Sequence, residues 1–125
     1  MPVEAGQCAA VTLLVGDGDT AIALRSGEVP VLATPRLIGL CEEAAVNAVA
    51  GHLKAGETTV SMKVQIDHLQ PSAVGHEVTA EATVDKVAGR RVSFTVSVND
   101  ERGLVAAGRV TRVVVDAEQF LTKCS

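Results

Sequence analysis

Residues 34–54 read TPRLIGLCEEAAVNAVAGHLK, and the spacing of their apolar side chains predicts one long amphipathic helix. Threonine is a favourable N-cap and proline is tolerated in the first helical turn, so we expect the helix to begin at Thr34-Pro35 with Thr34 as its cap. It should end near residue 53 or 54, before Gly56. The rest of the fold is predicted around this single helix.

Segments with the pattern of β-strands lie on both sides of the helix. Before it, residues 10–15 and 20–24 are predicted strands, and the Gly-Asp-Gly-Asp run between them predicts a hairpin turn, because the run lacks the further oxygen ligands of a calcium-binding loop. Residues 25–32 should be irregular. After the helix, four stretches rich in β-branched residues are predicted as strands, at 59–69, 74–87, 91–99 and 104–115. Short connections between these four predict an antiparallel sheet, and one helix on such a sheet defines an α+β fold.

The composition limits the architecture and the partners. With 125 residues, of which 47% are apolar, the chain is expected to form a single domain, 1–125, with an aliphatic core. One helix leaves apolar sheet area uncovered, so a homodimer or a higher homo-oligomer is expected. The net charge of -4, with acidic and basic residues interleaved and neither Trp nor Tyr, argues against a nucleic-acid partner.

The sequence lacks the signals of export, membrane insertion and metal binding. Residues 1–7 contain no basic region followed by an apolar stretch, and no apolar run approaches the roughly 18 residues of a membrane span. The cysteines Cys8, Cys41 and Cys124 are widely spaced and form no CxxC pair, so we expect reduced thiols and no metal site. A cytoplasmic protein without a membrane partner is therefore expected.

Two polar residues interrupt apolar patterns. On a helical projection from Arg36, Glu42 points about 120° away from the polar stripe, in the sector expected to face the sheet. A carboxylate there must be paired, protonated or used in chemistry. In the strand at 59–69, His68 continues an apolar row of alternate residues that starts at Val60. If the helix covers that row, a carboxylate and an imidazole meet at one interface, which suits general acid–base chemistry near neutral pH.

Structural explanations exist for the same residues. Glu42 at the edge of an interface can extend its carboxylate to water, and a histidine that ends an apolar row is often a hydrogen-bonded core residue. Thr34 has its expected role as N-cap. His52, in the last helical turn, suits the helix dipole, and His76 is expected to face solvent just beyond a turn.

Four arginines have two interpretations each. Arg90 and Arg91 follow Gly89 in a predicted turn, where they either bind phosphates or are solvated turn residues. Arg109 and Arg112 interrupt the last valine-rich strand, where either one caps the sheet edge or meets an anionic ligand.

Several short motifs resemble the fluoroacetyl-CoA thioesterase family of hotdog proteins. The similarity extends over about residues 29–120, and the spacing of the motifs is more informative than any single one. The motifs are Val31-Leu32-Ala33-Thr34, Gly39-Leu40-Cys41-Glu42, the segment around His68, Gly89-Arg90-Arg91-Val92-Ser93-Phe94 and Glu118-Gln119-Phe120. The resemblance implies a hotdog fold, in which an antiparallel sheet wraps around one long central helix.

By position, the resemblance assigns the family's catalytic Thr, Glu and His to Thr34, Glu42 and His68, and an arginine near the substrate to Arg112. It implies hydrolysis of a small acyl-CoA thioester to free acid and CoA, without a metal or redox cofactor. Glu42 would attack the thioester carbonyl or activate water, His68 would transfer protons, and Thr34 would orient the carboxylate or the carbonyl oxygen. Backbone amides near Gly39 or Thr34 are candidates for the oxyanion contact.

The chain departs from the family just before Thr34. The family member that removes fluoroacetyl groups has an aromatic lid there, whereas residues 25–31 of this chain contain Glu28 and no aromatic residue. A general housekeeping hydrolase, or one for another small acyl group, is therefore expected rather than a fluorine-selective one. Alternative functions are a non-catalytic hotdog module that binds CoA or acyl-CoA, and a purely structural dimer. A hotdog hydratase is disfavoured because its Asp or His motif is not found.

Overall fold

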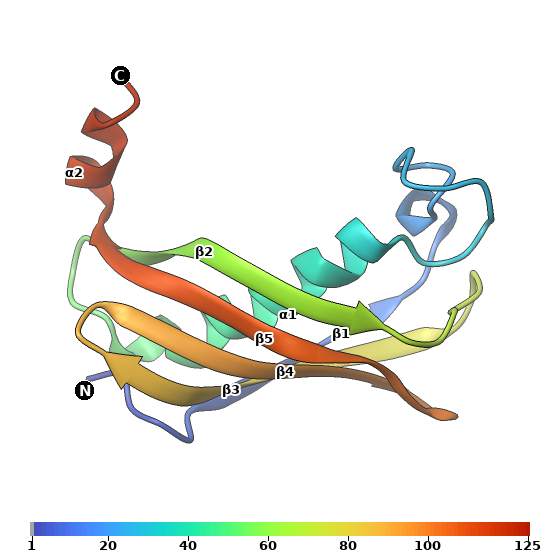
Figure 1. Cartoon of the computed structure of the whole chain (residues 1–125), viewed down its shortest axis with the longest axis horizontal. Coiled ribbons are helices and arrows are strands. Elements are labelled where there is room, and N and C mark those ends of the chain that lie inside the picture. Colours follow the sequence, from blue (N-terminus) through green and yellow to red (C-terminus); the bar gives the residue numbers. More distant parts are fainter. Residues whose placement is uncertain (1) are drawn as a thin grey trace.

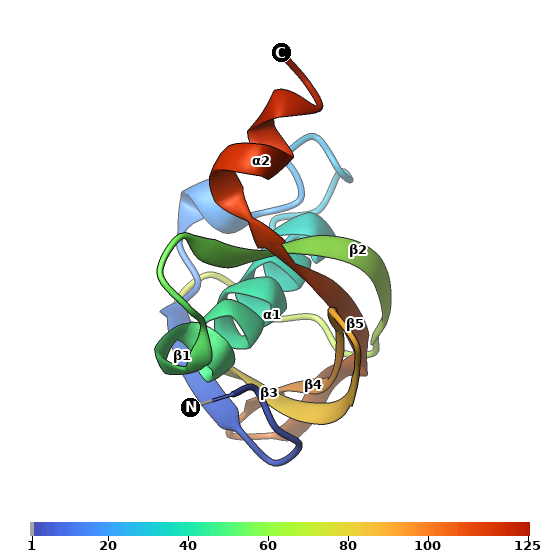
Figure 2. The same cartoon turned by 90° about the vertical axis from the view of Figure 1, so that its left-hand side faces the viewer.

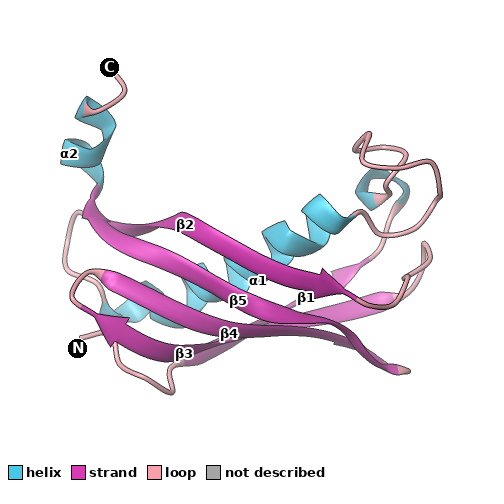
Figure 3. Ribbon diagram, in the orientation of Figure 1, coloured by secondary structure: helices cyan, strands magenta, loops and turns pink. Residues whose placement is uncertain are grey.

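A five-stranded antiparallel sheet packs against one long helix in the computed structural model, which describes residues 2–125 (Figure 1, Figure 3). Met1, at the start of the segment expected to carry no export signal, lies outside the described residues. The strands are β1 (Cys8–Leu14), β2 (Glu57–His68), β3 (Glu77–Ala88), β4 (Arg91–Asp100) and β5 (Gly103–Asp116). The helices are α1 (Thr34–Val49), followed by the 3-10 turn η2 (Ala50–His52), and the short α2 (Ala117–Thr122). Within residues 2–125 no helix is long and apolar enough to cross a membrane.

The sheet has the strand order β1-β3-β4-β5-β2, and every neighbouring pair is antiparallel. The predicted α+β class, with its antiparallel sheet and single long helix, is thereby confirmed. Although β3 follows β2 in sequence, β2 pairs with β5 and forms one edge of the sheet. Seen from the end, the strands curve around α1 (Figure 2). A sheet wrapped around one central helix is the hotdog arrangement.

The core lies between α1 and the concave side of the sheet. Alternate residues of β3 and β4 point inward and are fully buried, as the period-two pattern of a strand requires. These residues are Val78, Ala80, Ala82, Val84, Val92, Phe94, Val96 and Val98. The helix meets them with small buried side chains at Cys41, Ala44, Ala45 and Ala48, which let its backbone approach the sheet closely. Apart from Phe94, this core is aliphatic, as the composition predicted.

The predicted hairpin before the helix is wrong. Residues 20–24 form no strand but a turn that follows the 3-10 turn η1 (Asp17–Asp19). One carboxylate oxygen of Asp19 accepts the amide of Gly16 at 2.9 Å, and the other forms an ion pair with Arg36 at 2.9 Å. The acidic run therefore fastens this turn to α1 instead of closing a hairpin. Residues 25–32 are irregular, as predicted.

The start of α1 also differs from its prediction. Ala33 is the N-cap, with extended backbone, and Thr34 occupies the first helical position without capping the helix. The hydroxyl of Thr34 is therefore available for a contact outside the helix. At the other end, the α-helix stops at Val49 and continues as η2 to His52, close to the predicted end.

A β-bulge changes which residues of β2 face inward. The pairing of β2 with β5 shifts at Met62, so Met62 is an extra residue and the alternation changes phase there. As a result Thr59 is buried and Met62 is exposed, whereas His68 remains partly buried. The predicted unbroken row from Val60 to His68 is therefore wrong before the bulge, where Thr59 takes the inward position.

Candidate active site

The first polar pair joins the beginning of α1 to the end of β2. Thr34 Oγ1 and His68 Nδ1 lie 2.8 Å apart, in hydrogen-bonding contact. His68 Nε2 is buried and has no hydrogen-bond partner within residues 2–125. Burial of the ring lowers the pKa of His68, and a hydrogen bond with the backbone of Gln70 opposes this shift. The ring is therefore neutral at pH 7 and has one ring nitrogen available for proton transfer.

A cavity of about 330 Å³ opens beside this pair. One wall is the irregular loop before α1, which contributes residues between Ala21 and Leu32, and the other wall is the segment that follows β2, at 69–71. Thr34 and His68 are both part of the lining. The polar pair is thus positioned where a small molecule can reach it.

The second polar pair lies further along α1. Glu42 Oε1 accepts a hydrogen bond from Arg112 Nη1 at 3.0 Å. Arg112 is only 7% exposed, and it also donates to the hydroxyl of Thr59 at 2.9 Å and to the carbonyl of Thr59 at 2.8 Å. Burial lowers the pKa of Arg112, and the charge of Glu42 opposes this shift. Thr59 was not predicted as a site residue, because the bulge that turns it inward leaves no signal in the sequence.

Glu42 lies at the border of the buried face of α1 and does not face the middle of the sheet as the helical projection predicted. Its side chain is 28% exposed. Pro35, Gly39 and Val46, on the same flank of the helix, are also exposed. The sheet curves around a narrower face of α1 than the projection assumed, so a carboxylate stands beside an uncovered strip of apolar and small residues.

Within one chain the two polar pairs are separate. Among residues 2–125, Glu42 makes no hydrogen bond with Thr34 or His68. His68 pairs with Ala106 across the β2–β5 ladder, whereas Arg112 pairs at the other end of β2, and these two β5 positions are about 20 Å apart along an extended strand. The structure therefore brings Thr34 to His68 and Glu42 to Arg112, but it does not join the predicted Thr, Glu and His in one chain.

The other predicted substrate-binding residues lie away from the Thr34–His68 pair. Gly39 is exposed in the second turn of α1. Apart from the adjoining helix backbone, no heavy atom of residues 2–125 lies within 4 Å of where its side chain would begin. Arg90 lies in the β3–β4 turn, 3.5 Å from Glu57 and 3.3 Å from the carbonyl oxygen of Val114. Arg91 begins β4 and is exposed. Both arginines are at the end of the sheet opposite His68.

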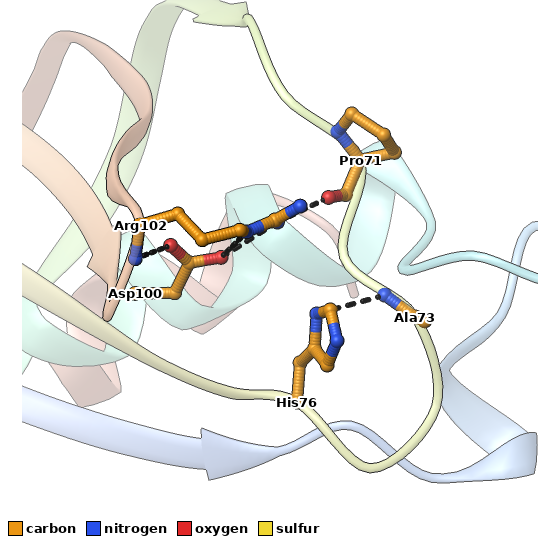
Figure 4. A network of polar contacts seen from close by, with 5 residues as sticks. All are labelled: Pro71, Ala73, His76, Asp100 and Arg102. Atoms are coloured by element: carbon orange, nitrogen blue, oxygen red, sulfur yellow. Dashed lines mark hydrogen bonds and ion pairs between the residues drawn. The ribbon is translucent and has the colours of Figure 1, made fainter.

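Arg109, His52 and His76 lie outside the cavity beside Thr34 and His68. Arg109 forms an ion pair with Asp85 at 2.9 Å. His52 Nδ1 is buried without a hydrogen-bond partner in the described part of the chain. His76 was predicted to face solvent but is partly buried, and its Nδ1 accepts the amide of Ala73 at 3.4 Å (Figure 4).

Next to His76, an ion pair fastens the segment that follows β2. Arg102 binds the carboxylate of Asp100 at 2.7 Å and donates to the carbonyl oxygen of Pro71 at 2.6 Å (Figure 4). Because Pro71 lines the cavity beside His68, this contact fixes one cavity wall.

The cysteines are free thiols. Cys8 and Cys124 are exposed, and Cys41 is buried in α1. Burial, together with the charge of Glu42, raises the pKa of Cys41 to about 11, so this thiol is not a nucleophile near neutral pH. No group of three His, Cys, Asp or Glu side chains in residues 2–125 could hold a metal ion.

Comparison with known proteins gives one consistent result. The family model for fluoroacetyl-CoA-specific thioesterase matches residues 15–118. The fluoroacetyl-CoA thioesterase of Streptantibioticus cattleyicolor is 34% identical over 93 residues, which are 74% of this chain and 67% of that protein. A solved structure of the fluoroacetyl-CoA thioesterase FlK has a TM-score of 0.92 at 29% identity, over 99% of this chain and 96% of that chain. A hot-dog-like protein from Thermanaerovibrio acidaminovorans has a TM-score of 0.89 at 27% identity, over 96% and 89%.

Fold, cavity and relatives together define this protein as an acyl-CoA thioesterase of the hotdog class. Within that class, the chain belongs to the fluoroacetyl-CoA-specific thioesterase family.

Proposed function

We propose that this chain hydrolyses a small acyl-CoA thioester with Thr34, Glu42 and His68 as its catalytic residues. The observation that supports this most is the 2.8 Å contact between Thr34 and His68 at the wall of a cavity, where His68 Nε2 has no hydrogen-bond partner among residues 2–125. A structure of a FlK mutant contains fluoroacetate and CoA, which supports a CoA ester as the substrate here. The proposal requires no cofactor besides the CoA portion of the substrate.

Each residue has a distinct role in the proposed reaction. Glu42 attacks the thioester carbonyl, or it activates the water molecule that attacks. The neutral ring of His68 takes up the proton that this water loses, directly or through Glu42, and gives it to the CoA thiolate that leaves. Thr34 holds the ring of His68 in position through its hydroxyl. The first amides of a helix have no partner inside the helix, so the amide of Thr34 is the proposed donor to the oxyanion.

We further propose that the two polar pairs meet in a homodimer. β2 is an edge strand with one free side, and an edge strand favours pairing with a second copy. Antiparallel pairing of two β2 edges about a two-fold axis places the His68 end of one strand beside the Thr59 end of the other. Glu42 of one subunit, which is linked to Thr59 through Arg112, would then face Thr34 and His68 of its partner. The uncovered flank of α1 beside Glu42 is the surface that such pairing would cover.

The same arrangement gives roles to the remaining predicted residues. Arg90 and Arg91 lie at the Thr59 end of the sheet, so in the proposed dimer they are near the partner's His68 end and could bind the CoA phosphates. Gly39 leaves space on the exposed flank of α1, where a side chain would obstruct the approach of a substrate or a partner.

The direct test is release of free thiol from a panel of acyl-CoA esters. We expect the native protein to hydrolyse at least one ester, and Glu42→Gln and His68→Ala to lose most of that activity. His76→Ala is the matched control, since His76 is a partly buried histidine outside the cavity. Absence of hydrolysis for every ester would refute the enzyme proposal and leave CoA binding as the function. Unchanged hydrolysis in both site variants would refute the residue assignment.

A further inference from the structure

We infer that the acyl group accepted by this site is uncharged and aliphatic. The inference rests on the proposed function, because it concerns the cavity beside Thr34 and His68. The side chains that form its walls include Ala21, Val29, Val31, Leu69 and Pro71. None of its lining residues in the described chain is Asp, Glu, Lys, Arg, Phe, Tyr or Trp.

The absence of a cation from this chain's part of the lining disfavours an acyl group that ends in a carboxylate. In the proposed dimer, Glu42 of the other subunit brings a negative charge to the same site, which disfavours a carboxylate further. The polar lining residues other than Thr34 and His68 are Ser26 and Gln70, and both are uncharged. His68 adds no positive charge at neutral pH, because burial lowers its pKa. An ionised carboxylate in the cavity would lose its hydration without gaining a counter-charge.

The apolar lining favours an aliphatic chain. Val29 and Leu69 are both 55% exposed although they line the cavity, so water contacts their apolar surface when the site is empty. An aliphatic acyl group would cover this surface. Each methylene that becomes buried increases binding roughly three- to fourfold. No Phe, Tyr or Trp among the described residues lines the cavity and limits the length of the acyl chain.

The two walls differ in how they are held. Pro71 is fixed through Arg102 (Figure 4). The carbonyl of the neighbouring Ser72 accepts the amide of Leu32 at 2.8 Å. The opposite wall is a loop closed at its base by the amide of Ala21 and the carbonyl of Val31, at 2.8 Å. On this loop Val29 lines the cavity, whereas Ile22, which is 53% exposed, does not. Val29 and Ile22 are thus a matched pair for testing the lining.

The experiment compares kcat/KM for acetyl-, butyryl-, hexanoyl- and succinyl-CoA. Butyryl and succinyl groups have the same chain length and differ in the terminal carboxylate. We expect kcat/KM to rise from acetyl- to hexanoyl-CoA and to be on the order of 10-fold or more lower for succinyl- than for butyryl-CoA. Equal rates for butyryl- and succinyl-CoA would overturn the inference while thioester hydrolysis itself stands. Hydrolysis of no ester would overturn the proposed function, and this inference with it.

A pair of variants tests whether the cavity lining causes the preference for butyryl- over succinyl-CoA. Val29→Arg places a guanidinium in the lining and is expected to reduce the preference for butyryl- over succinyl-CoA at least several-fold. Ile22→Arg places the same charge on the same loop outside the cavity and is expected to leave the preference unchanged. Both residues are more than half exposed, so both variants should fold, and equal melting temperatures would verify this. An equal change in preference in both variants would overturn the assignment of Val29 to the acyl site.

Discussion

The Thr34–His68 pair and the Glu42–Arg112 pair differ in how completely their hydrogen-bonding capacity is used. Arg112 is buried and makes three hydrogen bonds, one to Glu42 and two to Thr59. His68 makes one side-chain contact, has a buried nitrogen without a partner in the part of the chain that the structure describes, and lines a cavity. The first pair therefore has capacity left for chemistry. In the second pair Arg112 is occupied in holding α1 to β2 and β5, and only Glu42, which is 28% exposed and uses one carboxylate oxygen in this contact, has capacity left. The position of a polar residue at an apolar interface is thus not enough to identify it as reactive. The hydrogen bonds that it already makes decide whether it has a free donor or acceptor for catalysis.

Removal of the unpaired imidazole should have the largest effect. His68→Ala is expected to lower kcat/KM by a factor of about 10² to 10⁴, the usual contribution of a general acid or base. His76→Ala should stay within about twofold, because His76 contacts a turn amide and lies outside the cavity. If His68→Ala retained full activity, the contrast between the two pairs would have no catalytic meaning.

A change in the second pair should affect both catalysis and stability. Glu42→Gln removes the charge that compensates buried Arg112, which should lower the free energy of unfolding by about 1–3 kcal/mol as well as the activity. The double variant Glu42→Gln/Arg112→Met removes the uncompensated charge, so it should recover much of the stability without recovering the activity. Urea unfolding and thiol release measure the two quantities separately. Recovery of both would show that Glu42 acts only through structure.

Thr34 should contribute less than either of these residues. Thr34→Val keeps the shape of the side chain and removes the hydroxyl that contacts His68, which should cost roughly 10-fold in kcat/KM. Thr34→Ser keeps the hydroxyl and should remain close to the native value. Neither change should lower the melting temperature through loss of a cap, since Ala33 is the N-cap. Equal losses in both variants would indicate that the methyl group matters instead.

The lowered pKa of His68 should have the smallest effect on kcat/KM at neutral pH and a measurable effect at acidic pH. Because the reaction uses the neutral ring, the acid limb of kcat/KM should have its midpoint below about 6.5, the ordinary pKa of histidine. Protonation also favours the unfolded state, whose histidine takes up its proton first as the pH falls. The contribution of His68 to stability is therefore complete above about pH 6.5 and decreases as the pH falls toward the lower pKa of the folded protein. A limb that is unchanged in active His68 variants would contradict this assignment. A midpoint above 6.5 would show that the carboxylate of Glu42 in the other subunit outweighs the effect of burial.

The fold followed from the sequence where local patterns decide structure. The periodicity of α1 and the β-branched runs after it predicted the helix and four strands to within a few residues, because burial on one face imposes the period directly. The segment at 20–24 failed because its pattern resembles a strand, while Asp19 binds Gly16 and Arg36 and closes a turn. The pairing of β2 with β5 depends on contacts far apart in sequence, which no local pattern specifies.

The sequence indicated two residues of the candidate site but not how they are arranged. Glu42 and His68 each interrupt an apolar pattern, so the sequence itself indicates them. Their partners did not follow: Thr59 turns inward only because of the bulge at Met62, and Arg112 reaches Glu42 only because β5 lies beside β2. The resemblance to the family grouped Thr34, Glu42 and His68, whereas the contacts divide them into two pairs.

The central proposal, that Glu42 of one subunit acts with Thr34 and His68 of the other, can be tested by mixing two inactive variants. Glu42→Gln and His68→Ala, each carrying a different affinity tag, are unfolded together, refolded and assayed for thiol release, and the doubly tagged dimer is isolated. Random pairing of the subunits should restore about one quarter of the native activity in the whole mixture and about one half in the isolated doubly tagged dimer, because each mixed dimer contains one intact site and one doubly defective site. If doubly tagged dimers form and remain inactive, each site is contained within a single chain and the proposal is wrong.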